Sequence, residues 1–397
     1  MDRDQCLALD AQDPLRAFKD EFVLPEGVIY LVGNSLGAPP KRTAERMRRA
    51  VEDEWGGLLV GGWNHAGWYD LPLTLGDRLA PLIGAGPGQV VVGNTTSIAI
   101  FQAVAAALRL RPGRKVIVSD AQNFPTDHYM VQGLAGLVGG YEIRDLAEGS
   151  FDGAAVVLLS EVDYRTGARR DMAEVTAAAH AAGALIVWDL CHSVGAMEVD
   201  VSDADFAVGC TYKYLSAGPG APAFLYVNPR HHGTAENVLT GWHGHAAPFA
   251  FETDFRPADG MRRFVISTPH VLSLAALDAA LDLFERVPMA QVRAKSKALT
   301  SLFAELVGDR LELLSPADPD ARGSQISLRH PDGYPVMRAL IDRGVHGDFR
   351  APDTLRFGFA PLYLGYTDVY DAAATLLEVL DKELWRDEKY TVRLAVT

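Results

Sequence analysis

The amino-acid sequence predicts an α/β fold with a mostly parallel sheet, and two observations lead to this class. Five short apolar runs have the composition of strands that are buried on both faces. Helical patterns alternate with them, as expected for right-handed strand–helix–strand units. The five runs cover residues 115–119, 154–160, 184–189, 205–210 and 223–227.

Other elements are predicted around these runs. A short strand over residues 90–92 and an apolar helix over residues 98–108 precede the first run. Another helix, over residues 172–182, ends at Gly183, directly before the third run. This spacing leaves room for crossover helices between parallel strands.

The pattern changes after His270. Two long helices are predicted there, over residues 271–286 and 292–307, and they are followed by strands over residues 324–329 and 354–359. Because 397 residues exceed a typical domain of roughly 100 to 200 residues, we expect two domains.

We expect the large domain to cover residues 46–269 and a smaller α+β domain to cover residues 270–397. The N-terminal segment, residues 1–45, is expected to pack with the smaller domain. Within this segment, Pro39 and Pro40 open a predicted helix.

The composition is that of a globular protein, with 48% hydrophobic and 22% charged residues. The 51 acidic residues exceed the 37 basic ones, and a net charge of −14 without a basic run argues against a nucleic-acid partner. The longest weakly polar stretch, residues 90–110, is interrupted by polar residues at 93–97 and by Gln102. We therefore expect no membrane-spanning segment.

Residues 1–5 lack the apolar core of a signal peptide. The three cysteines, Cys6, Cys191 and Cys210, show no CxxC spacing. The expected location is therefore the cytoplasm, with reduced cysteines.

α/β sheets often bind nucleotides, but this sequence lacks the motifs that bind them. The glycine-rich stretch over residues 84–88 lacks GxGxxG spacing and follows a helical pattern, and no GxxxxGK[ST] motif occurs. A surface turn is the better interpretation of residues 84–88.

A polar cluster, residues 94–97, lies between the predicted strand 90–92 and the helix that follows it. Hydroxyl groups and free amides at a helix N-terminus can hold a phosphate, and the helix dipole adds to the attraction. An ordinary N-cap is the alternative, since Ser and Thr often cap helices.

Asp189 ends a wholly apolar strand, at the sheet edge where open α/β sheets bind ligands. A carboxylate there can hydrogen-bond the protonated ring nitrogen of a pyridoxal cofactor and keep the ring an electron sink. His192 follows three residues later and can reach the same ring or support Asp189; a histidine satisfied in the core is the alternative.

Lys213 lies just beyond another apolar strand, between Tyr212 and Tyr214. Its aromatic neighbours favour a partly desolvated amine, which is a good nucleophile toward an aldehyde, although a loop lysine is usually only a solvated charge. The phosphate turn, Asp189 and Lys213 are weak signals one by one. Their order along one α/β domain indicates a pyridoxal 5′-phosphate enzyme with Lys213 as its Schiff-base lysine.

That order, with these local sequences, resembles the fold-type I pyridoxal-phosphate enzymes, and within them the kynureninase family over nearly the whole chain. Cysteine desulfurases share the Asp, the His and the Lys, but not the full set of segments. The segments are LVGNSLG (31–37), FPTD (124–127), WDLCHS (188–193), YKYL (212–215) with GPG (218–220), GWHGH (241–245), and LR (355–356) before APLY (360–363).

The resemblance implies a seven-stranded sheet in the large domain and a homodimer. It also implies hydrolysis of L-kynurenine or 3-hydroxykynurenine to anthranilate or 3-hydroxyanthranilate and L-alanine. The catalytic residues that it implies are Lys213, Tyr212 and Asp189.

The remaining site residues also come from the resemblance. The cofactor contacts are expected from Thr96, Ser97, Phe124, Pro125, Thr126, Asp127, Ser160, Thr166, Asp189, His192, Tyr212, Lys213, Trp242 and Thr268. The substrate contacts are expected from Arg356, Asn34, Ser35, His65 and His243. Arg356 is expected to hold the α-carboxylate, because a guanidinium offers a planar two-pronged donor.

Two positions depart from the family pattern. Thr268 and Ala99 stand where an asparagine is common. They bear on the aryl specificity and on the phosphate contacts, and not on the reaction class, because neither is Lys213 or Asp189.

Three other functions are less consistent with the sequence. A cysteine desulfurase or selenocysteine lyase needs a catalytic cysteine in a mobile loop, and neither Cys191 nor Cys210 lies in a C-terminal loop. A catalytically silent cofactor-binding protein is expected to lose Lys213 or Arg356, and both are present. A zinc site at His192, His243 and His245 lacks HExxH spacing and further ligands nearby.

Overall fold

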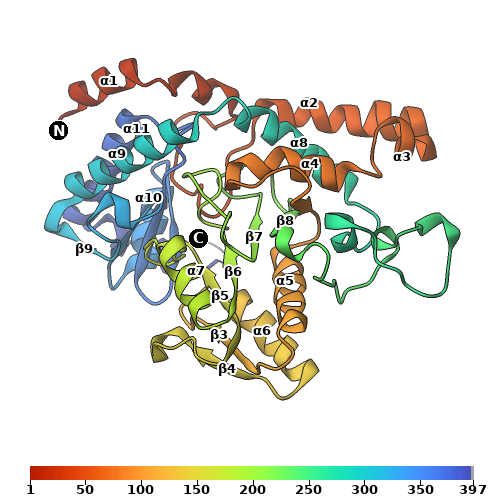
Figure 1. Ribbon diagram of the computed structural model, residues 1–397. Coiled ribbons are helices and arrows are strands. Elements are labelled where there is room, and N and C mark those ends of the chain that lie inside the picture. Colours follow the sequence, from red (N-terminus) through yellow and green to blue (C-terminus); the bar gives the residue numbers. More distant parts are fainter. Residues whose placement is uncertain (395–397) are drawn as a thin grey trace.

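The protein is described here by a computed structural model that covers residues 1–394. A large sheet lies at the centre with helices on both faces, and a second sheet with its own helices lies beside it (Figure 1). The predicted α/β class, with a mostly parallel seven-stranded sheet and a smaller α+β part, is confirmed. No helix within residues 1–394 is long and apolar enough to cross a membrane.

The large sheet has the strand order β2-β8-β7-β6-β5-β3-β4. Strands β3 to β7 run parallel to one another, as expected. The strands are β2 Val90–Val92, β3 Val116–Ser119, β4 Glu142–Asp145, β5 Ala154–Ser160, β6 Leu185–Asp189, β7 Phe206–Cys210 and β8 Ala223–Val227.

Two strands of this sheet differ from the expectation. β8, expected to be parallel, runs antiparallel to β7, because residues 211–222 contain no crossover helix. β4 was not predicted, since three of its four residues are charged; at the edge of the sheet a strand needs less apolar surface.

Each strand of the sheet divides its side chains between two cores. In β5, Val157 and Leu159 pack in the core on one face, while Val156 and Leu158 pack in the core on the other. This alternation buries both faces of the sheet, which explains the continuous apolar runs.

Helices cover both faces of the sheet (Figure 1). On one side lie α5 Thr96–Leu110 and α6 Pro125–Val138. On the other lie α4 Leu71–Leu79, α7 Met172–Ala181 and α8 Val271–Phe284.

The second sheet is antiparallel, with the order β12-β13-β10-β9. Its strands are β9 Glu312–Leu313, β10 Gln325–Arg329, β12 Asp348–Arg350 and β13 Thr354–Gly358. Its helices are α9 Met289–Val307, α10 Gly333–Ile341 and α11 Tyr366–Asp381.

The N-terminal segment contacts this C-terminal part. β1 Ile29–Tyr30 pairs in parallel with β11 Val345–His346, and α1 Arg3–Gln12 lies beside α11 (Figure 1). A buried ion pair joins Asp13 to Lys295 at 2.5 Å. The exact domain boundaries stay a prediction.

The helix predicted after Pro40 is α2 Lys41–Arg49, which continues in wider π-helical turns over Ala50–Gly56. The short helix α3 Gly62–His65 follows it. Together they form the arm at the upper right of Figure 1.

Asp205, just before β7, is a buried carboxylate that holds several groups together. It accepts hydrogen bonds from Ile186 N at 2.9 Å and Arg230 Nη2 at 2.7 Å, and it lies 2.8 Å from His180 Nε2 and 2.7 Å from His231 Nε2. Burial by itself raises the pKa of Asp205, but the hydrogen bonds from His231, His180 and the others outweigh it and lower that pKa well below its usual range.

We expect Asp205→Asn to lower the free energy of unfolding by about 3 kcal/mol at neutral pH, because it removes the charge that Arg230 faces. A lowered folded-state pKa means that this stabilisation is present above the usual carboxyl range and is lost as the pH falls below about 4. Urea unfolding at neutral and acid pH measures the difference, which should shrink at the acid end. Asp203→Asn, at a nearby exposed side chain, is the control.

Candidate active site

The candidate site is a cavity of about 330 Å³ at the carboxyl ends of β5, β6 and β7, where open α/β sheets bind ligands. Most of the predicted site residues line it, from both the large sheet and the C-terminal part. They are Asn34, Ser35, Thr96, Ser97, Phe124, Thr126, Asp127, Ser160, Asp189, His192, Tyr212, Lys213 and Arg356. A second cavity of about 480 Å³ contains none of the predicted residues.

Lys213 lies in the loop between β7 and β8, and its amine meets His192. The distance from Lys213 Nζ to His192 Nε2 is 2.7 Å. Burial, and next the charge of Lys213, keep the pKa of His192 well below its usual range. A neutral imidazole accepts a hydrogen bond at Nε2, so it can orient the lysine amine toward the cavity.

Two carboxyl groups face each other across the floor of the cavity. Asp189 ends β6, and its Oδ1 accepts a hydrogen bond from Cys191 N at 2.8 Å. Asp127, in the first turn of α6, is buried, and burial followed by the charge of Asp189 raises its pKa well above the usual range. In residues 1–394, Asp127 Oδ2 and His192 Nδ1 have no hydrogen-bond partner. Because buried polar atoms are normally paired, these two atoms can bind a polar ligand.

The N-terminus of α5 forms another wall. Thr95 caps the helix, and its hydroxyl accepts a hydrogen bond from Ile98 N at 3.5 Å, while Thr96 and Ser97 line the cavity. Residues 94–97 therefore lie at a helix N-terminus, where Thr95 is an ordinary N-cap, and Asn94 lines a separate cavity. The phosphate-binding role of Thr96 and Ser97 stays a prediction, and a helix N-terminus favours an anion.

Tyr212 lines the same cavity. Burial, and next the neighbouring Cys210 and Cys191, raise the pKa of Tyr212 well above its usual value. Its phenol therefore stays protonated near neutral pH and can donate a hydrogen bond or a proton.

Arg356, in β13, is almost fully buried at the opposite wall. Its Nε and Nη2 donate to the two oxygens of Asp348 at 2.6 and 2.5 Å, and its Nη1 donates to the carbonyl of Tyr164. These bonds use three of the five N–H groups of a guanidinium. Two donors remain for a ligand.

Phe124 presents an aromatic wall. Its ring is 45% exposed and packs edge-on against Tyr164, with the ring centroids 5.3 Å apart. An exposed aromatic face inside a polar cavity suits a flat ring as its partner.

Six predicted residues lie outside this cavity. Pro125 is the first residue of α6, next to the wall. The hydroxyl of Thr166 donates to Asp163 at 2.7 Å, and Thr268 lines a separate cavity. The other three are His65, at the end of α3, and Trp242 and His243, whose rings lie 4.6 Å apart. The roles assigned to these six stay predictions.

Five residues of the cavity had no role in the prediction from sequence: Tyr164, Cys191, Gly220, Ala221 and Arg350. Tyr164 and Cys191 follow the carboxyl ends of β5 and β6, so the strand-end rule was a usable signal for them. Arg350 gave no sequence signal. Its place depends on how the second sheet packs.

Gly37 brings the N-terminal loop against the backbone of Lys213. Its N–H donates to the carbonyl of Tyr212 at 2.9 Å. A Cβ at this position would lie 2.2 Å from the carbonyl oxygen of Lys213 and 2.3 Å from Ser216 Oγ. Only glycine allows this approach.

We expect Gly37→Ala to displace the Lys213 loop and to lower turnover by about 10²-fold, the usual cost of a misplacement of about 1 Å. Activity and the visible absorbance of the bound cofactor measure the effect. Gly133→Ala is the matched control, because a Cβ there meets nothing within 4 Å. Unchanged activity in Gly37→Ala would contradict the argument.

Comparisons with known proteins agree with this geometry. Residues 292–376 match the family model described as the kynureninase C-terminal domain. The kynureninase of Burkholderia pseudomallei (strain 1106a) is 49% identical over 413 residues, which cover 100% of this chain and 99% of the relative. The kynureninase of Pseudomonas fluorescens is 47% identical with the same coverage. The chain belongs to the kynureninase family.

Three solved structures share the fold of this chain. The cysteine desulfurase of Thermococcus onnurineus NA1 is 20% identical, with a TM-score of 0.77 over 92% of this chain and 97% of that one. The cysteine desulfurase CsdA of Escherichia coli is 18% identical, with a TM-score of 0.78 over 94% and 98%. A C-DES variant whose pyridoxal-phosphate cofactor carries a covalently linked glycine is 18% identical, with a TM-score of 0.73 over 90% and 98%.

These structural likenesses show the fold alone, whereas kynureninases match the sequence from end to end. As a kynureninase-family member, the chain is a pyridoxal-phosphate enzyme of the hydrolase class. In residues 1–394 no group of three His, Cys, Asp or Glu side chains is arranged to hold a metal ion.

Proposed function

We propose that this protein hydrolyses L-kynurenine, or its 3-hydroxy derivative, to anthranilate, or 3-hydroxyanthranilate, and L-alanine. One observation carries the proposal. Lys213, Asp189 and Arg356 open on one cavity of about 330 Å³ in a chain that is 49% identical to kynureninases over its full length. Degradation of tryptophan or a related biosynthetic pathway is the setting that this activity implies.

The residues of the cavity fit pyridoxal 5′-phosphate. Bound there, the cofactor supplies an electron sink for the bonds around the substrate α-carbon. Lys213 would bind its aldehyde, Asp189 would pair with its ring nitrogen, and Thr96 with Ser97 would bind its phosphate at the start of α5. This set is supported by the orphaned oxygen of the neighbouring Asp127, which needs a partner from a ligand.

Other cavity residues complete the cofactor site in this proposal. Phe124 would stack on the cofactor ring, and Asp127 would contact the ring hydroxyl. Tyr212 donates its phenolic hydrogen to the phosphate, which its raised pKa supports. Thr126, Ser160 and His192 line the remaining edge.

Substrate binding is assigned to the opposite wall. Arg356 receives the α-carboxylate with its two remaining donors. Asn34, whose Oδ1 has no partner among the described residues, and Ser35 contact the rest of the substrate.

Two residues move protons in this proposal. Lys213 Nζ takes the proton from the substrate α-carbon, and the neutral His192, 2.7 Å away, keeps the amine in place. Tyr212 holds its proton at neutral pH and gives it to the γ-carbonyl oxygen as water adds to the carbonyl carbon, and it takes up in exchange the proton that this water loses. Lys213 and Tyr212 then return protons to the alanine part as it leaves.

We also propose a homodimer and a cytoplasmic location. An exposed aromatic surface, formed by Trp242, Phe249 and Phe251, supports an interface. His65, Trp242 and Thr268 lie outside this chain's cavity and are exposed, so they can complete the partner's site, whereas His243 is buried behind Trp242. The three unpaired cysteines favour a reducing compartment.

The test uses the purified protein loaded with cofactor. L-Kynurenine and 3-hydroxykynurenine are added separately, and the aryl acid and alanine are measured by chromatography. We expect equal amounts of aryl acid and L-alanine from at least one of them. No alanine from either substrate would remove the proposed activity and leave the family assignment intact.

A further inference from the structure

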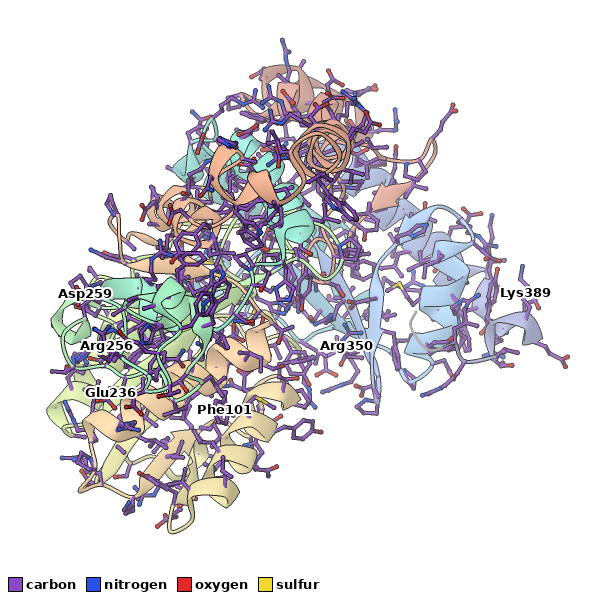
Figure 2. The ribbon with its side chains drawn as sticks, turned by 90° about the vertical axis from the view of Figure 1, so that its right-hand side faces the viewer. Phe101, Glu236, Arg256, Asp259, Arg350 and Lys389 are labelled. Carbon is purple, nitrogen blue, oxygen red and sulfur yellow. The ribbon has the colours of Figure 1, made fainter. Side chains whose placement is uncertain are left out.

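Two arginines face the substrate end of the cavity. Arg356 and Arg350 both line it, from β13 and β12 of the second sheet. Figure 2 shows Arg350 where this sheet, in blue, meets the rest of the molecule. The function proposed above uses Arg356 alone.

Both guanidinium groups share one carboxylate. Asp348 binds Arg356 through both of its oxygens at 2.6 and 2.5 Å, and its Oδ2 also accepts from Arg350 Nη2 at 3.1 Å. Together, Arg350, Arg356 and Asp348 therefore carry two positive charges and one negative charge. Burial, and next the charge of Arg356, lower the pKa of Arg350, although a guanidinium stays protonated.

The net positive charge of these three side chains acts on other groups of the cavity. Arg356 and Arg350 both contribute, after burial and Lys213, to the lowered pKa of His192. A positive charge that is partly withdrawn from water favours a counter-ion, so these two arginines and Asp348 together favour a second anion. The α-carboxylate of an amino acid is the anion that the proposed substrate brings.

Arg350 has donors to bind that anion. One N–H of Nη2 contacts Asp348, and one of Nη1 donates to the carbonyl of Phe349 at 2.9 Å. Three of its five N–H groups remain, and its side chain is 34% exposed, in contrast to 2% for Arg356. Arg350 is thus the more adjustable of the two.

We propose that Arg350 and Arg356 bind the substrate α-carboxylate together, with Asp348 setting the position of both. The inference rests on the proposed function, since it deepens the recognition of the amino-acid end. Arg356 is held in place by its hydrogen bonds to Asp348 and Tyr164, and Arg350 moves toward the carboxylate when the substrate binds. Two charged carboxylates then balance two guanidinium groups.

The test separates the carboxylate from the aryl end of the substrate. L-Alanine carries the α-carboxylate without an aryl ring, and 2-aminoacetophenone carries the aryl ketone without a carboxylate. Their dissociation constants are measured by titration calorimetry on the cofactor-loaded protein. We expect Arg350→Gln to weaken L-alanine binding by about 10- to 100-fold, as for a charge-assisted hydrogen bond, and to leave 2-aminoacetophenone binding within about threefold.

Arg350→Lys keeps the charge and is expected to recover part of the loss, which also covers the case in which the glutamine variant does not fold. Arg329→Gln is the matched control, because Arg329 lies in the same sheet on β10 and pairs with Glu312 outside the cavity. Unchanged L-alanine binding in Arg350→Gln, or an equal loss for both ligands, would overturn the inference. L-Alanine binding does not require kynurenine cleavage, so a failure of the proposed function is distinguishable from a failure of the arginine pair.

Discussion

Lys213→Ala is expected to lower turnover of L-kynurenine by at least about 10³-fold. The substitution removes both the covalent attachment of the cofactor and the base that takes the α-proton, and a positioned base alone contributes 10² to 10⁴. It should also abolish the visible absorbance of the lysine-bound cofactor. Steady-state kinetics and an absorbance spectrum of the dialysed protein measure both effects.

The surroundings of Lys213 support the expected loss of activity. Nζ lies 2.7 Å from the buried His192, and within residues 1–394 no ion pair joins this amine to a carboxylate. Lys297→Ala is the control, because Lys297 is a surface residue paired with Asp320. If Lys213→Ala kept the absorbance band and the activity, another lysine would have to hold the cofactor.

Much of the fold was predictable because its strands are buried on both faces. A strand that is buried on both faces is apolar along its whole length, so the ends of the apolar run mark the ends of the strand. The predicted bounds of β5, Ala154–Ser160, are those that the structure gives. The direction of β8 was not predictable from composition, since a buried strand is apolar whether it runs parallel or antiparallel. The polar edge strand β4 carried no periodic signal at all.

Some residues of the candidate site were predictable from the local sequence, and others were not. Asp189 and Lys213 follow apolar strands, so the rule that ligands bind at strand ends located them, and the structure brings both to one cavity. Arg350 was out of reach, because it enters the cavity only through the packing of the second sheet, more than 130 positions after Lys213 in the sequence. Cavity residues that depend on long-range packing carry no local pattern.

Asp189 and Asp127 allow a second prediction with a large effect. Asp189→Asn is expected to lower kcat by about 10²- to 10³-fold, because an amide cannot stabilise a protonated ring nitrogen by charge. Asp127→Asn should stay within about tenfold of the wild type. The raised pKa of Asp127 keeps its carboxyl protonated to higher pH than usual, and an amide is a close substitute for a neutral carboxyl group.

The cofactor-free protein provides an independent check of the same pair. For a carboxyl group whose folded-state pKa is raised, the stability contribution is present below the unfolded pKa and is lost as the pH rises through the folded value. Asp127→Asn removes this loss, so the cofactor-free variant should unfold at a higher temperature than the wild type at about pH 8, and the gap should close toward about pH 4. If instead Asp127→Asn were the crippling variant and Asp189→Asn the mild one, the two carboxyl groups would have exchanged roles, and Asp127 would be the charged partner of the cofactor.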